Sequence, residues 1–226
     1  MSSGAAAKFG DCLKLGIFGG TFDPIHYGHL RMAEEARERI GLDRVLFVPN
    51  QVSPFKVGKL ISPCAQRIEM IRLAISGNPA FEFDTIELDR PGPSYTVDTL
   101  RAIKLRAPAE TELFFLTGAD AVRDLAGWRE PEEILRLTRL VAATRPGVSS
   151  DDIVRALPAA WRERILFLEM PELDIAATDL RERIRTGRSI RYLTSPAVEK
   201  FVTMRGLYRA APPEAGASAE MGESDF

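Results

Sequence analysis

The stretch from Gly16 to Leu30 constrains the fold of this chain more than any other part of its sequence. It reads GIFGGTFDPIHYGHL and contains both histidines of the 226-residue chain, His26 and His29. Its apolar start is typical of a strand, its glycine pair of a turn, and an amphipathic helix is expected from about Gly28. Such a turn directs unpaired backbone N–H groups and the positive end of a helix at a bound anion.

The two imidazoles add side-chain donors to this turn. Neutral or charged, an imidazole can donate a hydrogen bond to a phosphate oxygen. The alternatives are packed or capping histidines and a metal site. A metal site would need further ligands nearby, and Asp23 alone is a poor third ligand. The turn therefore favours a phosphate site.

Composition restricts the class of protein further. A chain of 226 residues with 45% hydrophobic residues fits one α/β domain with a small C-terminal helical part. The net charge of −2 argues against a broad nucleic-acid or membrane surface. Cys12 and Cys64 give no disulfide framework or metal-ligand spacing, which predicts a reducing cytoplasmic environment. No apolar run is long enough to span a bilayer, and the N-terminus lacks a secretory pattern.

Strand-like and helix-like segments alternate, which predicts an α/β fold with a doubly wound, Rossmann-like parallel sheet and helices on both faces. Strands are expected at Leu13–Phe18, Arg44–Pro49, Phe81–Leu88, Glu112–Thr117, Arg139–Thr144 and Ile165–Leu168. Helices are expected at Gly28–Ile40, Pro63–Ser76, Tyr95–Leu105, Ala119–Leu125, Pro131–Leu137, Thr178–Thr186 and Ser195–Met204. The domain should span residues 12–209, between a flexible N-terminus at 1–11 and a disordered tail at 210–226.

A second motif, DIAATDLR, occupies residues 174–181. Thr178 can cap a helix there, and Arg181, one turn further on, faces the same side. Alone, this would be an ordinary helix cap followed by a surface arginine. Together with GGTFDPxHxGHL, it resembles the nucleotidyltransferase superfamily, whose two motifs are H-x-G-H and I-S-x-T-x-[IL]-R.

The middle of the chain resembles a narrower family, the bacterial nicotinate-nucleotide adenylyltransferases. The segments that carry this resemblance are VPN at 48–50, SPFK at 53–56, PSYT at 93–96, GADA at 118–121, Trp128, IL at 134–135, TRPG at 144–147 and the stretch from Ser189 to Tyr208. The resemblance implies transfer of the adenylyl group of ATP to nicotinate mononucleotide, giving nicotinate adenine dinucleotide and pyrophosphate in NAD biosynthesis. It also implies Mg²⁺ brought in with ATP, and it leaves homo-oligomerisation open.

The same resemblance implies roles for particular residues. The catalytic set that contacts the triphosphate is His26, His29, Thr178 and Arg181. The ATP-binding set adds Gly19, Gly20, Thr21, Phe22, Gly118 and Asp120. The set that binds the acceptor mononucleotide is Asn50, Lys56, Tyr95, Thr96, Trp128, Arg129 and Arg145. Trp128 would stack on the pyridine ring, and backbone N–H groups near Thr96 and Arg129 would receive the nicotinate carboxylate.

Several of these residues have ordinary alternative roles. On spacing alone, Trp128 is better explained as a buried core aromatic. Asp120 either accepts a hydrogen bond from a ribose hydroxyl or caps the helix after Gly118. Lys56 is expected in a loop, where lysines are usually solvated, and Arg145 is equally well explained as a surface cation.

Two positions depart from the family pattern, and both bear on function. The first family serine falls at Ala176, which removes a hydroxyl donor worth about 1 kcal/mol, and the usual loop histidine falls at Phe55. These departures are the only hints of one alternative, a nucleotide-binding module without turnover. The enzyme alternatives are one that prefers nicotinamide mononucleotide and one with another adenylyl or cytidylyl acceptor.

Overall fold

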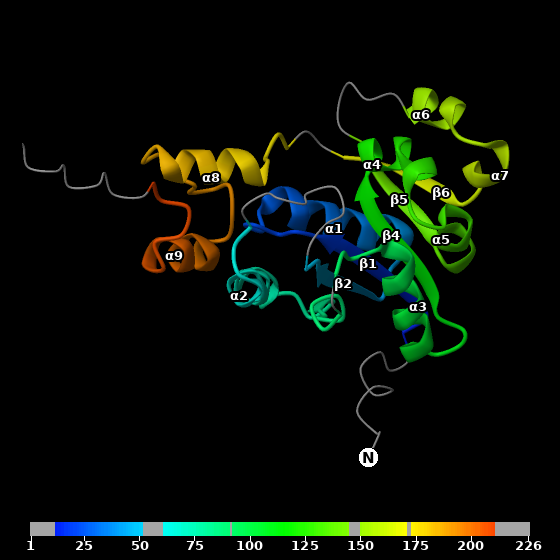
Figure 1. Cartoon of the computed structure of the whole chain (residues 1–226), viewed down its shortest axis with the longest axis horizontal. Helices are drawn as coiled ribbons and strands as arrows, with labels where there is room; N and C mark the ends of the chain where they lie inside the picture. The colour runs from blue at the N-terminus through cyan, green and yellow to red at the C-terminus, as the bar shows by residue number, and fades with distance from the viewer. Residues whose placement is uncertain (1–11, 52–60, 91, 145–149, 171–172, 211–226) are drawn as a thin grey trace, which may run out of the picture.

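The computed structural model describes residues 12–51, 61–90, 92–144, 150–170 and 173–210 (Figure 1). Its strands are β1 (Lys14–Gly20), β2 (Arg44–Pro49), β3 (Phe81–Phe83), β4 (Glu112–Gly118), β5 (Arg139–Thr144) and β6 (Ile165–Glu169). Its helices are α1 (Tyr27–Ile40), α2 (Cys64–Ile75), α3 (Thr96–Arg106), α4 (Ala119–Arg123), α5 (Pro131–Leu137), α6 (Ser150–Ala156), α7 (Ala159–Arg162), α8 (Ala177–Arg185) and α9 (Pro196–Met204), with a 3-10 turn, η2 (Leu125–Gly127). Segments 1–11 and 211–226, expected to be flexible, lie outside the described residues.

The sheet confirms the predicted doubly wound, parallel architecture. Its strand order is β3-β2-β1-β4-β5-β6, and every neighbouring pair is parallel. The order reverses direction between β1 and β4, so the connections from these strands leave toward opposite faces. A crevice therefore opens at the carboxyl ends of β1 and β4, where ligands of such folds bind.

Two hydrophobic cores cover the two faces of the sheet, because successive strand residues point to opposite sides. Phe18 belongs to the core under α1, α2, α8 and α9. Its neighbour Ile17 belongs to the core under α3, α4, α5 and α6. Figure 1 shows α8 and α9 at one end of the molecule and α6 and α7 at the other. None of the described helices is long and apolar enough to cross a membrane.

The third strand is shorter than the alternating pattern predicted. It ends at Phe83, whereas a strand was expected as far as Leu88. The Asp84 carboxylate accepts a hydrogen bond from the Ile86 N–H at 3.0 Å, and the Leu88 N–H donates to the Thr85 carbonyl at 2.8 Å. These local bonds turn the chain, since an aspartate side chain competes with the sheet for backbone donors. Helices α6 and α7 were also not predicted.

Gly41 ends helix α1 in a left-handed conformation, with a φ of 71°. Its N–H and that of Leu42 both return to the Arg37 carbonyl, the second at 2.9 Å. Residues other than glycine adopt this backbone conformation only with strain. The turn brings the buried Leu42 against the sheet, so this glycine fixes how α1 leads into β2.

We expect Gly41→Ala to lower the free energy of unfolding by about 1 kcal/mol, because alanine at a positive φ is strained. Denaturant unfolding followed by circular dichroism measures the change. Gly77→Ala is the matched control, since Gly77 has no positive φ and no neighbouring atom within 4 Å of an added Cβ. Equal stability of the two variants would contradict the role given to Gly41.

Candidate active site

Two cavities lie at the carboxyl edge of the sheet, one on each side of β1 and β4. The first, of about 670 Å³, is lined by the start of α1, the start of α8 and the ends of β1, β4 and β5. The second, of about 390 Å³, is lined by residues that follow β2, by the start of α3 and by residues 127–129. Gly19, Thr21 and Thr117 line both cavities. Two ligands bound in these cavities could therefore meet above the β1–β4 pair.

The histidine turn forms one wall of the first cavity. The His26 backbone N–H donates to His29 Nδ1 at 3.2 Å, and the two rings stack with centroids 3.7 Å apart. A Cβ on Gly28 would lie 3.0 Å from His26 Nδ1, so the glycine leaves room for the imidazole. Because Nδ1 of His29 accepts a hydrogen bond, the neutral ring carries its proton on Nε2, which can donate to a ligand.

The start of α8 forms the opposite wall. Thr178 and Arg181 line the first cavity together with His26 and His29. Arg181 Nη1 also donates to the Asp23 carbonyl at 2.7 Å, which joins α8 directly to the histidine turn. The structure thus brings the two sequence motifs to one place.

The helix cap at the start of α8 differs from the prediction. Ala176 is the N-cap, with extended backbone angles of −121° and 138°, and Thr178 lies inside the first turn. The cap receives no side-chain hydrogen bond from residue 176, because alanine has no polar atom. Ala176, Ala177 and Thr178, at the start of α8, all line the first cavity.

Asp23 ties the histidine turn to distant parts of the chain. Its carboxylate is buried, with 3% exposure, and accepts hydrogen bonds from the Tyr208 hydroxyl at 2.5 Å and the Ser62 N–H at 3.1 Å. Its carbonyl accepts the bond from Arg181. Burial and the nearby Asp23 carboxylate raise the pKa of Tyr208, so its hydroxyl remains a donor. Donors from three distant segments of the chain therefore hold Asp23, and with it the turn, in place.

Arg67, on α2, also supports the histidine turn. This side chain is only 1% exposed and donates to the Thr21 carbonyl at 2.9 Å and the Ser62 carbonyl at 3.1 Å. Sequence reasoning missed both Arg67 and Tyr208 as supports of the site. The available signal was an arginine on the apolar face of α2, whose buried residues also include Met70 and Ile71.

The second cavity collects the residues expected to bind the acceptor. Tyr95 and Thr96 line it from the start of α3, and Trp128 and Arg129 line it from the segment after η2. Trp128 is partly buried and meets the Phe115 ring edge to face, with centroids 6.1 Å apart. One side of the tryptophan therefore packs on the core while the residue borders the cavity.

Two side chains that line this cavity offer buried hydrogen-bond acceptors to a ligand. The Asn50 amide oxygen is buried and receives no hydrogen bond from any described residue. Glu87, which sequence reasoning missed, is 7% exposed and accepts a hydrogen bond from the Thr99 hydroxyl at 2.6 Å. Burial raises the pKa of the Glu87 carboxyl. Both groups are acceptors, which suits the hydroxyls of a ribose.

Three of the remaining predicted site residues line one of the two cavities. Gly118 and the buried Phe22 line the first cavity, and Gly20 lines the second. Asp120 lies in the first turn of α4, 3.6 Å from Arg123, and borders neither cavity formed by the described residues. Gly118, not Asp120, is the N-cap of α4. Lys56, Arg145 and the departure Phe55 lie outside the described residues.

Comparisons with known proteins agree with this arrangement. A cytidylyltransferase-like family model matches residues 17–183. A "probable nicotinate-nucleotide adenylyltransferase" of Roseiflexus sp. is 48% identical over 86% of this chain and 98% of its own length. The protein of the same name in Thermus thermophilus is 46% identical over 87% of this chain and 100% of its own.

A solved structure has the same fold. It is the Plasmodium falciparum nicotinic acid mononucleotide adenylyltransferase complexed with NaAD, with a TM-score of 0.72 at 18% identity, covering 86% of this chain and 97% of its own. The sheet, the crevice and the histidine turn define a nucleotidyltransferase. Within that class, the chain belongs to the nicotinate-nucleotide adenylyltransferase family.

We expect Tyr208→Phe to lower the free energy of unfolding by about 1–2 kcal/mol, because it leaves the buried Asp23 carboxylate without one of its donors. The altered turn should also raise the KM for ATP several-fold. Denaturant unfolding and steady-state kinetics measure the two effects. Tyr192→Phe is the control, since Tyr192 is 84% exposed. Similar behaviour of both variants would contradict the link from Tyr208 to the turn.

Proposed function

We propose that this protein transfers the adenylyl group of ATP to nicotinate mononucleotide, forming nicotinate adenine dinucleotide and pyrophosphate for NAD biosynthesis. The observation that carries the proposal is the pair of cavities that share Gly19, Thr21 and Thr117. The names of the relatives point to the same substrates. ATP would occupy the first cavity and the mononucleotide the second, so that their phosphates meet over the shared residues.

The reaction is a displacement at phosphorus. An oxygen of the mononucleotide 5′-phosphate forms a bond to the α-phosphorus of ATP, and the bond from that phosphorus to the bridging oxygen breaks as pyrophosphate leaves. Such a transfer needs no protein nucleophile; it needs aligned reactants and donors that meet the developing charge. The protein would act by placing two substrates end to end.

The first cavity supplies donors for the triphosphate. His29, through Nε2–H, and His26 would contact phosphate oxygens in the transition state. Thr178 and Arg181 would hold the leaving pyrophosphate, the guanidinium by charge-assisted hydrogen bonds. Two helix starts, those of α1 and α8, border the same cavity and favour anions there. Gly19, Thr21, Phe22 and Gly118 line the same cavity and complete the proposed ATP site.

The second cavity suits a pyridine nucleotide acceptor. Trp128 borders it with a ring that could stack on the pyridine, and Asn50 offers an acceptor for a ribose hydroxyl. The backbone N–H groups of Thr96 and Arg129 would receive the carboxylate, with Tyr95 alongside. Lys56 remains a candidate for binding the acceptor phosphate, and Arg145 for a contact with the nucleotide.

Magnesium would enter as part of the substrate, bound to ATP. The described residues offer no cluster of three or more His, Cys, Asp or Glu side chains for a resident ion. Hydrated Mg²⁺ usually takes phosphate oxygens as ligands, which fits this proposal. We further propose a cytoplasmic enzyme whose domain spans residues 12–209 and which uses small-molecule substrates rather than nucleic acid or membrane lipid; homo-oligomerisation stays open.

Pyrophosphate release by the purified protein tests the function. With ATP and nicotinate mononucleotide we expect turnover and formation of the dinucleotide, and with nicotinamide mononucleotide a lower kcat/KM. A higher kcat/KM with the amide would contradict the carboxylate pocket. Tight ATP binding without pyrophosphate release would identify a binding module instead of an enzyme.

We expect His29→Ala to lower kcat about 100-fold or more, because a donor to the transition state is lost. His29→Gln is the matched variant, since glutamine at this helix position can still accept the His26 N–H. It should keep the stability of the wild type and recover only part of the activity, because its amide N–H donors are placed differently from Nε2–H of the imidazole. Near-normal turnover of His29→Ala, together with lowered stability, would show that the residue serves only the helix start.

A further inference from the structure

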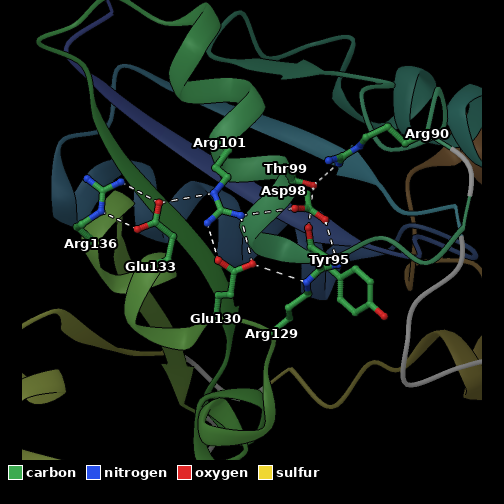
Figure 2. A network of polar contacts seen from close by, with 9 residues as sticks. All are labelled: Arg90, Tyr95, Asp98, Thr99, Arg101, Arg129, Glu130, Glu133 and Arg136. Carbon is green, nitrogen blue, oxygen red and sulfur yellow. Dashed lines mark hydrogen bonds and ion pairs between the residues drawn. The ribbon is translucent and has the colours of Figure 1, made fainter.

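Two carboxylates lie beside the second cavity, close to Arg129. Asp98 Oδ2 is 3.8 Å from Arg129 Nη1, and Glu130 Oε1 is 3.7 Å from Arg129 Nε (Figure 2). Neither carboxylate is among the residues that line the cavity, whereas Arg129 is. An anionic acceptor bound in the cavity would therefore be attracted by Arg129 and repelled by the two carboxylates next to it.

Arg101 is the second cation of this group. Its guanidinium donates to both carboxylate oxygens of Glu130, at 2.5 and 3.2 Å, and lies 3.8 Å from Asp98. The hydrogen bond from Arg101 lowers the pKa of Glu130, so this carboxyl is ionised at neutral pH. Asp98, Arg101, Arg129 and Glu130 thus form a four-residue charge cluster with balanced charges, which Figure 2 shows between α3 and α5.

Arg129 has a further neighbour in the second cavity. Its guanidinium carbon is 4.8 Å from the centre of the Tyr95 ring, and both residues line that cavity. The next residue, Glu130, has a φ of 53°, an uncommon conformation for a residue with a side chain. Because Arg101 anchors the Glu130 carboxylate, it holds both the backbone and the charge that follow Arg129.

Arg101 has a further acidic neighbour, Glu133, which is paired with another arginine. Glu133 Oε1 is 3.6 Å from Arg101 Nε, but both Glu133 oxygens accept hydrogen bonds from Arg136, at 2.6 and 2.8 Å. Removal of Arg101 would therefore leave Glu133 neutralised. The same removal would leave Asp98 and Glu130 with Arg129 as their nearest cation among the described residues.

We propose that Arg101 is a positioning residue that sets the preference of the second cavity for an acceptor carrying a carboxylate. This inference rests on the proposed function, in which the acceptor is the acid form of the pyridine nucleotide. Arg101 neutralises Glu130 and Asp98, so that the charge of Arg129 remains available to the carboxylate. Without Arg101, the cluster has a net negative charge, which repels a carboxylate and leaves a neutral amide unaffected.

Arg101→Ala tests the proposal by kinetics with both acceptors. We expect the KM for nicotinate mononucleotide to rise about 3- to 10-fold at low salt, a range set by the modest strength of partly exposed ion pairs. The KM values for nicotinamide mononucleotide and ATP should stay within about twofold of the wild type. The increase should shrink at high salt, because Arg101 and Glu130 are 40% and 42% exposed and therefore screened.

Three further variants separate charge from structure. Arg101→Lys keeps the charge and should bind the acid acceptor nearly as the wild type does. Arg101→Ala combined with Glu130→Gln removes one charge of each sign and should restore most of the lost affinity. Arg72→Ala is the matched control: Arg72 is an exposed arginine that donates to both oxygens of Glu69, at 2.6 and 2.8 Å, on α2. It should change no KM.

The outcomes are distinguishable. An equal rise of KM for the acid and amide acceptors would contradict the proposal and show a structural role only. An unchanged KM for the acid would also overturn it. A wild-type protein that does not use the acid acceptor would contradict the proposed function itself, before any variant of Arg101 is measured.

Discussion

The turn after β1 keeps its shape because Asp23 is held by segments that are far apart in the sequence. Tyr208, near the end of the described chain, donates to its carboxylate, and so does the Ser62 N–H before α2. Arg181 donates to its carbonyl from α8. A buried carboxylate is stable only when such donors surround it. The histidine turn and the start of α8 therefore occupy fixed relative positions, on which the first cavity depends.

The reversal of strand order between β1 and β4 brings two cavities side by side, as the proposed transfer between two substrates requires. Helices leave toward opposite faces at this point, so one cavity opens under α1 and α8 and the other beside α3 and the segment after η2. Thr21 and Thr117 lie between them, at the ends of neighbouring strands. The two cavities also differ in electrostatic character. The first is bordered by two helix starts and Arg181, whereas the second is bordered by Arg129, which belongs to a charge-balanced cluster.

Much of the fold and part of the site could be predicted from local pattern. Alternating apolar strands and amphipathic helices predicted the parallel sheet, and the stretch from Gly16 to Leu30 indicated the turn and its histidines. Local pattern failed at the ends of two elements. Asp84 ended β3 early by accepting the Ile86 N–H. Helix α8 has its N-cap at Ala176 rather than at the expected Thr178, and this N-cap makes no side-chain hydrogen bond.

Residue periodicity and short motifs are enough to predict the class of fold, the histidine turn and the family resemblance, because these depend on residues that are close in the chain. The distant groups that support the site become known from the folded structure alone. Tyr208 and Arg101 carry no local signal of their roles, and Arg67 carries only its position on the apolar face of α2, since each acts through a partner brought close by folding. Burial and distance, rather than residue type, make an ordinary arginine or tyrosine a support of the site, and both exist only once the chain is packed.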